Sequence, residues 1–194
     1  IIFGEIDGII EGHRFDGRRE MMENSFHRNW AAGIDGNGIE GTAAIVLSGG
    51  YEDDYDDGNE IVYTGAGGND PKSGRQREDQ SWTTSGNAGL LKSRDEGLPV
   101  RVIRGSKHAS PYSPKSGYVY AGLYSVVEAW EEVGRSGYRI CRFRLLHNGK
   151  NIPEINNSDL PLDYSDRTST RKETTILRIV RETKIAHQIK ELYN

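Results

Sequence analysis

The chain has 194 residues, of which 35% are hydrophobic and 24 are glycine, and its formal net charge at pH 7 is −4. This length suits one domain with a core, and the high glycine content favours a loop-rich β architecture over a helical bundle. No apolar run reaches the roughly 20 residues that span a bilayer, and the single Cys141 excludes an internal disulfide and a cysteine-rich zinc site. We therefore expect an intracellular protein with no membrane partner.

The negative net charge argues against a nucleic-acid partner, because non-specific DNA binding relies on Lys and Arg side chains that neutralise phosphates. The acids, however, are concentrated at residues 52–57, and basic residues form separate clusters elsewhere. This distribution predicts a modest affinity for DNA with a strong salt dependence. The basic clusters are Lys72, Arg75 and Arg77, and Arg101, Arg104 and Lys107.

Short strands separated by glycines are predicted over most of residues 1–146. Apolar and β-branched runs indicate strands at 42–47 and 60–64, with an acidic turn between them. Residues 79–92 are predicted to form the helix of this domain. The expected fold class is α+β, with a twisted, curved β-sheet or barrel and a few flanking helices. Alternating residues predict further strands at 98–103, 118–127 and 138–145, and neither face of the last one is uniformly apolar.

The pattern changes after residue 146. Residues 147–169 are rich in Asn, Asp, Ser and Pro and predict an irregular linker. Residues 170–194 begin with a capping-box pattern from Thr170 to Glu173, followed by hydrophobic residues at helical spacing. We predict an amphipathic helix that either packs on the preceding domain or leads into a following one.

The most informative segment runs from Ser48 to Asp70 and reads SGGYEDDYDDGNEIVYTGAGGND. Tyr51 and Tyr63 bracket its acidic turn, and glycines flank both of them. Glycine lets the backbone approach a ligand closely, and tyrosine rings offer flat faces on which a planar group stacks. A carboxylate between such rings accepts hydrogen bonds from an exocyclic amine. Together these residues indicate a pocket for one nucleobase extruded from a duplex.

This segment resembles the signature of the SRA (SET- and RING-associated, or YDG) domain, a family that binds modified cytosine flipped out of duplex DNA. The resemblance implies an SRA-like, PUA-like fold over residues 1–146. One departure is Ala121, which stands where the family's Tyr-Asp-Gly triplet has aspartate, and we expect it to remove a local side-chain bond and leave the pocket intact. Further segments that match in the family's order are 4–8, 27–36, 79–80, 87–90, 99–105, 118–124 and 134–145.

The resemblance also implies a role for each pocket residue. Tyr51 and Tyr63 are expected to stack on the two faces of the base, and the Asp54 carboxylate and backbone amide to pair with its edge. An acceptor facing N4 favours cytosine over thymine, and both 5-methylcytosine and 5-hydroxymethylcytosine remain open as ligands. Backbone groups complete the paired edge at Ser48, Gly49 and Thr64, and the wall against the C5 substituent is expected at Gly65 and Ala66.

Two loops are expected to meet the DNA where the base has left the stack. Ala31 takes the position that fills the gap in the first loop, and basic residues of the second loop, at 71–77, enter the groove. An Arg that contacts guanine O6 and N7 is the commonest specific base contact, although these residues equally suit phosphate contacts. The predicted DNA-contacting residues are Trp30, Ala31, Ala32, Lys72, Arg75, Gln76 and Arg77.

We predict a non-catalytic reader of double-stranded DNA that contains modified cytosine, with no cofactor and no metal. Its expected context is a bacterial SRA–HNH endonuclease in the cytoplasm, where a dimer forms, if at all, through a C-terminal domain outside this sequence. One alternative is the SRA domain of a nuclear ubiquitin ligase or histone methyltransferase from a eukaryote. A second alternative is a metal-dependent hydrolase that uses the acidic run at 52–57.

Overall fold

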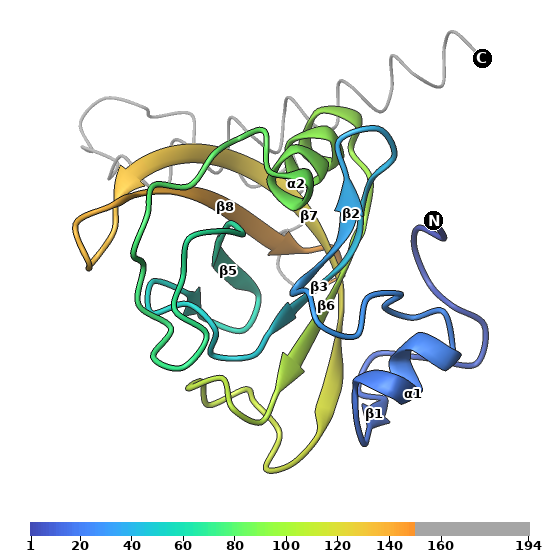
Figure 1. Cartoon of the computed structure of the whole chain (residues 1–194). Coiled ribbons are helices and arrows are strands. Elements are labelled where there is room, and N and C mark those ends of the chain that lie inside the picture. The colour runs from blue at the N-terminus through green and yellow to red at the C-terminus, as the bar shows by residue number, and fades with distance from the viewer. Residues whose placement is uncertain (150–194) are drawn as a thin grey trace, which may run out of the picture. The chain divides into compact units, whose positions relative to one another are not determined.

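A curved, eight-stranded sheet forms the centre of the domain. The structure, a computed structural model, describes residues 1–149, so the predicted helix at 170–194 and most of the predicted linker lie outside the described residues. The α+β class with a curved sheet and few helices is confirmed (Figure 1). The strands are β1 (Arg14–Phe15), β2 (Ile34–Asn37), β3 (Gly41–Leu47), β4 (Tyr55–Asp56), β5 (Glu60–Thr64), β6 (Val100–Gly105), β7 (Tyr118–Val133) and β8 (Arg139–His147), and the helices are α1 (Arg18–Glu23) and α2 (Ser85–Glu96).

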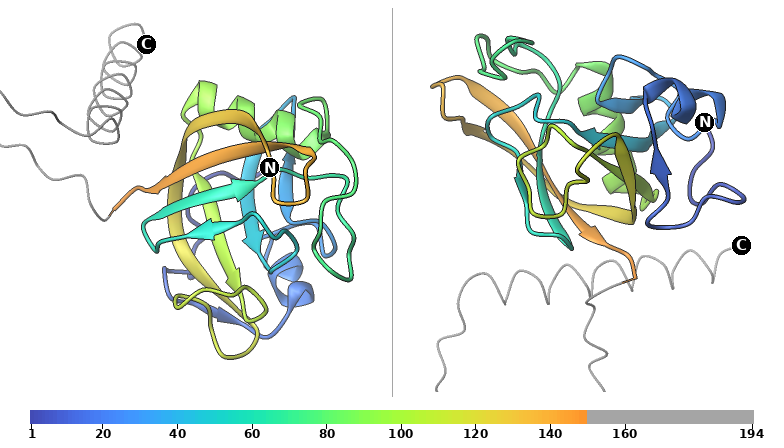
Figure 2. Two further views of the ribbon diagram at one scale, coloured as in Figure 1. Left: turned by 90° about the vertical axis from the view of Figure 1, so that its left-hand side faces the viewer. Right: turned by 90° about the horizontal axis from the view of Figure 1, so that it is seen from below.

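The sheet runs in the order β2-β3-β6-β7-β8-β5-β4, and β1 pairs with β7 beside this path. β3 and β6 are parallel, whereas the other neighbouring strands are antiparallel. β7 and β8 form a long ladder that arches over β5 (Figures 1 and 2). A shift in their register between Val126 and Glu128 marks a bulge, and a bulge bends the strand that carries it. This curvature places β5 and the pocket segment inside the bend.

Both faces of β3 are buried, because successive side chains of a strand point to opposite sides. Ile45 and Leu47 join a larger apolar cluster with Leu90 of α2, whereas Val46 joins a smaller cluster with Met21 of α1. A strand covered on both faces reads as an uninterrupted apolar run, which explains the pattern at residues 42–47. Within residues 1–149 no helix combines the length and the apolar character needed to cross a bilayer.

The helix lies further along the chain than predicted, at Ser85–Glu96 and not at 79–92. Residues before Ser85 are held by β8: the Gln80 amide donates to the Arg139 carbonyl at 2.8 Å, and the Arg139 amide donates to Asp79 Oδ1 at 2.8 Å. These bonds hold residues 79 and 80 along β8, and a turn closed by the Thr84 amide and the Ser81 carbonyl, at 3.2 Å, leads into the helix. β7 and β8 likewise run past their predicted ends, so β8 crosses the expected domain boundary at residue 146.

Candidate functional site

The structure brings Tyr51, Asp54 and Tyr63 together at the end of β5. The Thr64 amide donates a hydrogen bond to Asp54 Oδ1 at 2.8 Å, and Tyr63 interacts electrostatically with both Asp54 and Tyr51. On the other side, the Tyr51 hydroxyl accepts a hydrogen bond from the Gly67 amide at 2.9 Å. The two predicted ring faces and the predicted carboxylate are therefore neighbours in space.

The backbone of Thr64 faces Asp54 because of its place in the β5–β8 ladder. Gly65 donates to the Cys141 carbonyl at 2.8 Å, and successive residues of an antiparallel strand direct their backbone groups to opposite sides. The N–H and C=O of Thr64 thus point away from β8. β4 pairs with β5 only as far as Val62, which lies opposite Tyr55. Within the described residues, therefore, no strand pairs with this edge of Thr64. One donor and one acceptor of the backbone are left for side chains or a ligand.

Tyr63 and Thr64 are covered in this conformation, with exposed fractions of 2% and 0%. Tyr51 is half-buried, and its bond to Gly67 joins the segment before β4 to the glycine-rich segment after β5.

Burial dominates the electrostatics of the site. Burial raises the pKa of Asp54 to about 6. Hydrogen bonds from Thr64 and the nearby charges of His108 and Arg142 act in the opposite direction and lower this pKa, but by less. At neutral pH the Asp54 side chain is therefore mostly an ionised acceptor, and it gains a proton as the pH falls below about 6. Burial also raises the pKa values of Tyr51 and Tyr63, so both rings stay neutral.

The glycine-rich segment after β5 is held by the amide side chains of Asn87 and Gln80, which the sequence did not single out as site residues, and of Gln76, which was expected to contact DNA. Asn87 Oδ1 accepts a hydrogen bond from the Ala66 amide at 2.7 Å, and a Cβ at Gly65 would lie only 2.6 Å from that oxygen. Glycine is therefore required at 65. Two further amide nitrogens donate to carbonyls of the same segment: Gln80 Nε2 to Gly65 at 2.6 Å and Gln76 Nε2 to Gly67 at 2.7 Å.

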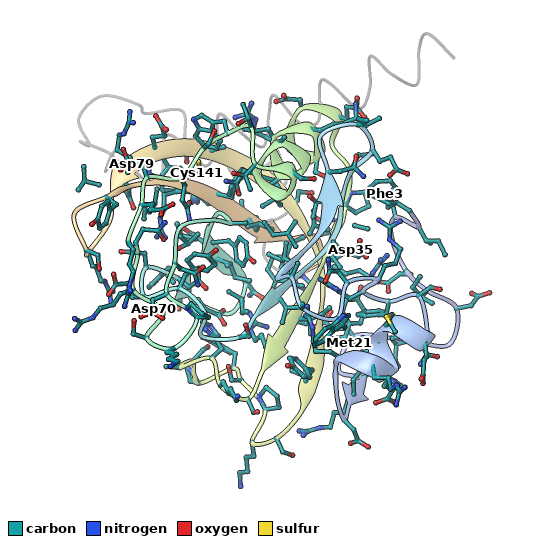
Figure 3. The ribbon with its side chains drawn as sticks, viewed as in Figure 1. Phe3, Met21, Asp35, Asp70, Asp79 and Cys141 are labelled. Carbon is teal, nitrogen blue, oxygen red and sulfur yellow. The ribbon has the colours of Figure 1, made fainter. Side chains whose placement is uncertain are left out.

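Gln76 differs from the expectation that it contacts DNA. It is 3% exposed, and its amide also donates to the Glu78 carbonyl at 2.8 Å, so the structure places it in the support of the glycine-rich segment. Lys72, Arg75 and Arg77 of the same loop are exposed, as expected. Figure 3 marks Asp70, the ion-pair partner of Arg77, on this outer loop.

The Trp30 loop is fixed by the side chain of Arg18 in α1. Arg18 donates to the carbonyls of Trp30 at 3.0 Å and Asn29 at 2.9 Å, and also to that of Ala32. Asn29 Oδ1 in turn accepts hydrogen bonds from the amides of Ala31 and Ala32, each at 2.9 Å. These bonds hold the loop in place, and Trp30 projects from it with 69% of its surface exposed. Arg18 was not predicted, because its partners are backbone carbonyls.

Gly33 connects this loop to the pocket. A Cβ at Gly33 would lie 2.8 Å from the Tyr63 hydroxyl, so the Gly33→Ala substitution must displace the buried tyrosine. We expect it to reduce the preference for modified DNA and to cost about 1–3 kcal/mol of stability, as overpacking does. Binding titrations and urea unfolding measure the two effects. The matched control is Gly17→Ala, where a Cβ meets nothing within 4 Å, and an unchanged preference in Gly33→Ala would contradict the assignment.

The acidic run is divided among different partners. Glu52 bonds to Ser136, Asp53 accepts from the Arg135 amide at 3.0 Å, and Asp56 forms an ion pair with Arg104 at 2.8 Å. Within residues 1–149 no group of three or more His, Cys, Asp or Glu side chains is placed to hold a metal ion. This geometry gives no support to a hydrolase centre at residues 52–57.

A hollow of about 450 Å³ lies beside the Trp30 loop, and neither Tyr51 nor Tyr63 lines it. Its charged groups are already paired, since Arg28 Nη2 lies 2.9 Å from Asp35 Oδ1, and Figure 3 marks Asp35 on β2. The hollow is lined by Arg28, Asn29, Trp30, Ile34, Asp35 and Gly36.

Comparison with known proteins finds one family model, the SAD/SRA domain, which matches residues 2–150. E3 ubiquitin-protein ligase UHRF1 of Danio rerio is 39% identical over 166 residues, which cover 75% of this chain and 21% of that protein. Histone-lysine N-methyltransferase family member SUVH2 of Arabidopsis thaliana is 41% identical over 152 residues, covering 75% of this chain and 23% of that protein. The chain thus spans less than a quarter of the length of these two curated relatives.

Two solved structures are also similar. The modification-dependent TagI restriction endonuclease has 49% sequence identity and a TM-score of 0.71, with 74% of this chain and 51% of that chain covered. SUVH5 SRA bound to fully hydroxymethylated CG DNA has 37% identity and a TM-score of 0.65, with 76% and 94% covered.

Proposed function

Because this chain belongs to the SAD/SRA domain family, we propose that it reads duplex DNA by holding one flipped, C5-modified cytosine between Tyr51 and Tyr63. The observation that carries the proposal is the Asp54 carboxylate, which neighbours both tyrosines and is fixed by the Thr64 amide at a part of the β5 edge that no strand among residues 1–149 pairs with. The domain itself acts as a binding module and not as a catalyst.

The arrangement favours cytosine on chemical grounds. The N4 amine of cytosine donates hydrogen bonds, and both the Asp54 carboxylate and the Thr64 carbonyl accept them. Thymine presents an oxygen at the same place, which would face two acceptors. Stacking on an aromatic ring contributes about 1–3 kcal/mol per base, which offsets a flipping cost of a few kcal/mol.

The C5 substituent lies, in this proposal, against Gly65 and Ala66. Asn87 holds Ala66 through both its amide and its carbonyl, at 2.7 and 3.1 Å, so the wall is rigid. A methyl side chain and a bare backbone form a small apolar surface that suits a methyl group and leaves room for a hydroxymethyl group. SUVH5 SRA, whose structure holds fully hydroxymethylated CG DNA, is consistent with this wider range.

The test is a duplex-binding titration at fixed, moderate salt. One oligonucleotide carries in turn cytosine, hemimethylated, fully methylated or hydroxymethylated cytosine at a single site. We expect a clear preference for at least one modified form, and the ranking names the mark that is read. Equal, salt-sensitive binding to all four duplexes would instead identify a general DNA-binding surface.

We further propose that the domain directs a modification-dependent restriction endonuclease of the HNH class in a bacterial cytoplasm. The 49% identity to the TagI endonuclease supports this context over a eukaryotic ubiquitin ligase or histone methyltransferase, to which the curated relatives point. Reading the coding sequence on either side of this chain, and testing cleavage of methylated against unmethylated plasmid by the encoded protein, decides between the two contexts.

The Arg75→Ala variant tests whether the outer loop at 71–77 contacts DNA. The Arg75 side chain is exposed beside the glycine-rich segment, so in Arg75→Ala we expect weaker binding to every duplex and a salt dependence whose slope falls by about 1. Titrations at several salt concentrations measure the slope. Arg19→Ala is the control, because Arg19 is equally exposed on α1, which lies across the domain from this loop (Figure 1). A loss confined to one sequence context would show that Arg75 reads a base.

A further inference from the structure

We infer that Arg142 of β8 is a positioning residue for the base-reading Asp54, and that it acts through the hydroxyl of Thr64. This inference rests on the proposed function. It adds to the pocket a residue that touches neither the base nor the DNA, and that lies 88 positions further along the chain than Asp54.

Arg142 lies directly under the pocket. Its side chain is 7% exposed, and its Nη1 donates to Thr64 Oγ1 at 2.6 Å and to the Asp53 carbonyl at 2.7 Å. Its Nε lies 2.9 Å from a carboxylate oxygen of Glu132 on β7. The guanidinium thus contacts the residue before Asp54 in the chain and the residue that binds Asp54 from β5.

The directions of these hydrogen bonds follow from the chemistry of the groups. A guanidinium has only donors, so Thr64 Oγ1 must accept from Arg142, and its own hydrogen is then free for another acceptor. Asp54 is the neighbouring acceptor: the Thr64 amide donates to its Oδ1 at 2.8 Å, and the Thr64 hydroxyl also acts to lower the pKa of the Asp54 carboxyl. The chain of bonds runs from Arg142 through Thr64 to Asp54. It favours the ionised form of Asp54 against the effect of burial, which raises the pKa, and in the proposed function it leaves lone pairs for the N4 amine.

The sheet register fixes this chain of bonds. Thr64 and Arg142 are directly opposed partners of β5 and β8, so their side chains share one face of the sheet. A slip of one residue would bring Phe143 to this place and send the cation to the opposite face. The position of the cation is therefore as well determined as the pairing of the strands.

Arg144 provides a natural comparison. It lies on the same face of β8 and is equally buried, at 7% exposed, but it pairs with Glu60 at 3.0 Å and Glu128 at 3.7 Å. Neither partner contacts Asp54 in the described hydrogen bonds. A purely structural role for buried arginines of β8 would make the two residues equivalent, whereas a positioning role separates them.

The experiment compares Arg142→Gln and Thr64→Val with Arg144→Gln. In the free protein, 13C NMR of the Asp54 carboxyl gives its pKa, which we expect to rise above about 6 in the first two variants and to stay unchanged in Arg144→Gln. In parallel, the preference for modified over unmodified duplex at pH 7 falls severalfold in the first two variants and recovers at higher pH, as the carboxyl ionises again. Thr64→Ser, which keeps the hydroxyl, restores both values.

The other groups that face Asp54 are Tyr51, Tyr63 and His108. Because His108 is a titratable side chain, His108→Gln is measured alongside to assign the transition to Asp54. If Arg142→Gln does not fold, Thr64→Val carries the test alone. An Asp54 pKa that does not move in Thr64→Val overturns the inference. A wild-type protein without any preference for modified DNA overturns the proposed function instead, and the NMR result distinguishes the two failures.

Discussion

Replacing Tyr63 or Asp54 by alanine is expected to abolish the preference for duplexes that contain modified cytosine. Each variant removes one contact that the proposed pocket makes with a flipped base: a ring face, or the carboxylate acceptor to which the Thr64 amide donates at 2.8 Å. The loss of one stacking face corresponds to about 1–3 kcal/mol, or roughly 5- to 150-fold in affinity. The measurement is the ratio of dissociation constants for unmodified and modified duplexes at one salt concentration.

Two variants control for damage to the fold. Tyr63 is 2% exposed and belongs to the apolar core, so Tyr63→Ala also destabilises the protein, and Tyr63→Phe is needed to keep the ring while removing the hydroxyl. We expect Tyr63→Phe to retain the preference. Tyr55→Ala, in the same hairpin but 52% exposed, is expected to leave it unchanged. If Tyr63→Ala and Asp54→Ala both keep the wild-type ratio, the pocket lies elsewhere.

Asp56→Ala is expected to cost about 3–5 kcal/mol of the free energy of unfolding at pH 7, because it leaves a buried guanidinium without its counterion. The Asp56 side chain is 1% exposed and accepts hydrogen bonds from Arg104 Nε and Nη2, each at 2.8 Å, and from Ser110 Oγ at 2.9 Å. His108 Nε2 lies 3.2 Å away. Urea unfolding of the two proteins measures the difference.

The same cluster sets a pH dependence. Hydrogen bonds from His108, Arg104 and Ser110 lower the pKa of Asp56 in spite of its burial, so the folded protein binds this proton less readily than the unfolded chain does. The stabilisation is complete above the unfolded value, near 3.8, and is lost as the pH falls below it. The gap between wild type and Asp56→Ala should shrink accordingly. Asp57→Ala, exposed and adjacent, should lie within about 0.5 kcal/mol of wild type, and a similarly small effect at Asp56 would contradict the argument.

The strands that carry the pocket were predictable from the sequence, because their signal is local. The apolar run at 42–47 and the β-branched run at 60–64 became β3 and β5 nearly residue for residue. β8 was less clear, since its arginines break the alternation. Arg142 and Arg144 are nevertheless buried, because acids on neighbouring strands pair with them.

The supports of the site were not predictable in the same way. Asn87 and Gln80 hold the segment after β5 through its backbone, and Arg18 holds the Trp30 loop through carbonyls. Every residue carries the same backbone groups, so a side chain that bonds to the backbone of another segment places no constraint on the residue types in that segment. The glycine at 65 is a trace of such a bond in the sequence, since a Cβ there would lie 2.6 Å from Asn87 Oδ1.

The bond between the Tyr51 hydroxyl and the Gly67 amide has a consequence for the energetics of the proposed pocket. The Tyr51 ring is held at its hydroxyl by a residue 16 positions further along the chain, so its orientation is already restricted in the folded protein. In the proposed function, a base that stacks on this ring does not have to order it, and the entropy cost of binding falls accordingly. Such preorganisation strengthens binding without adding a contact to the base.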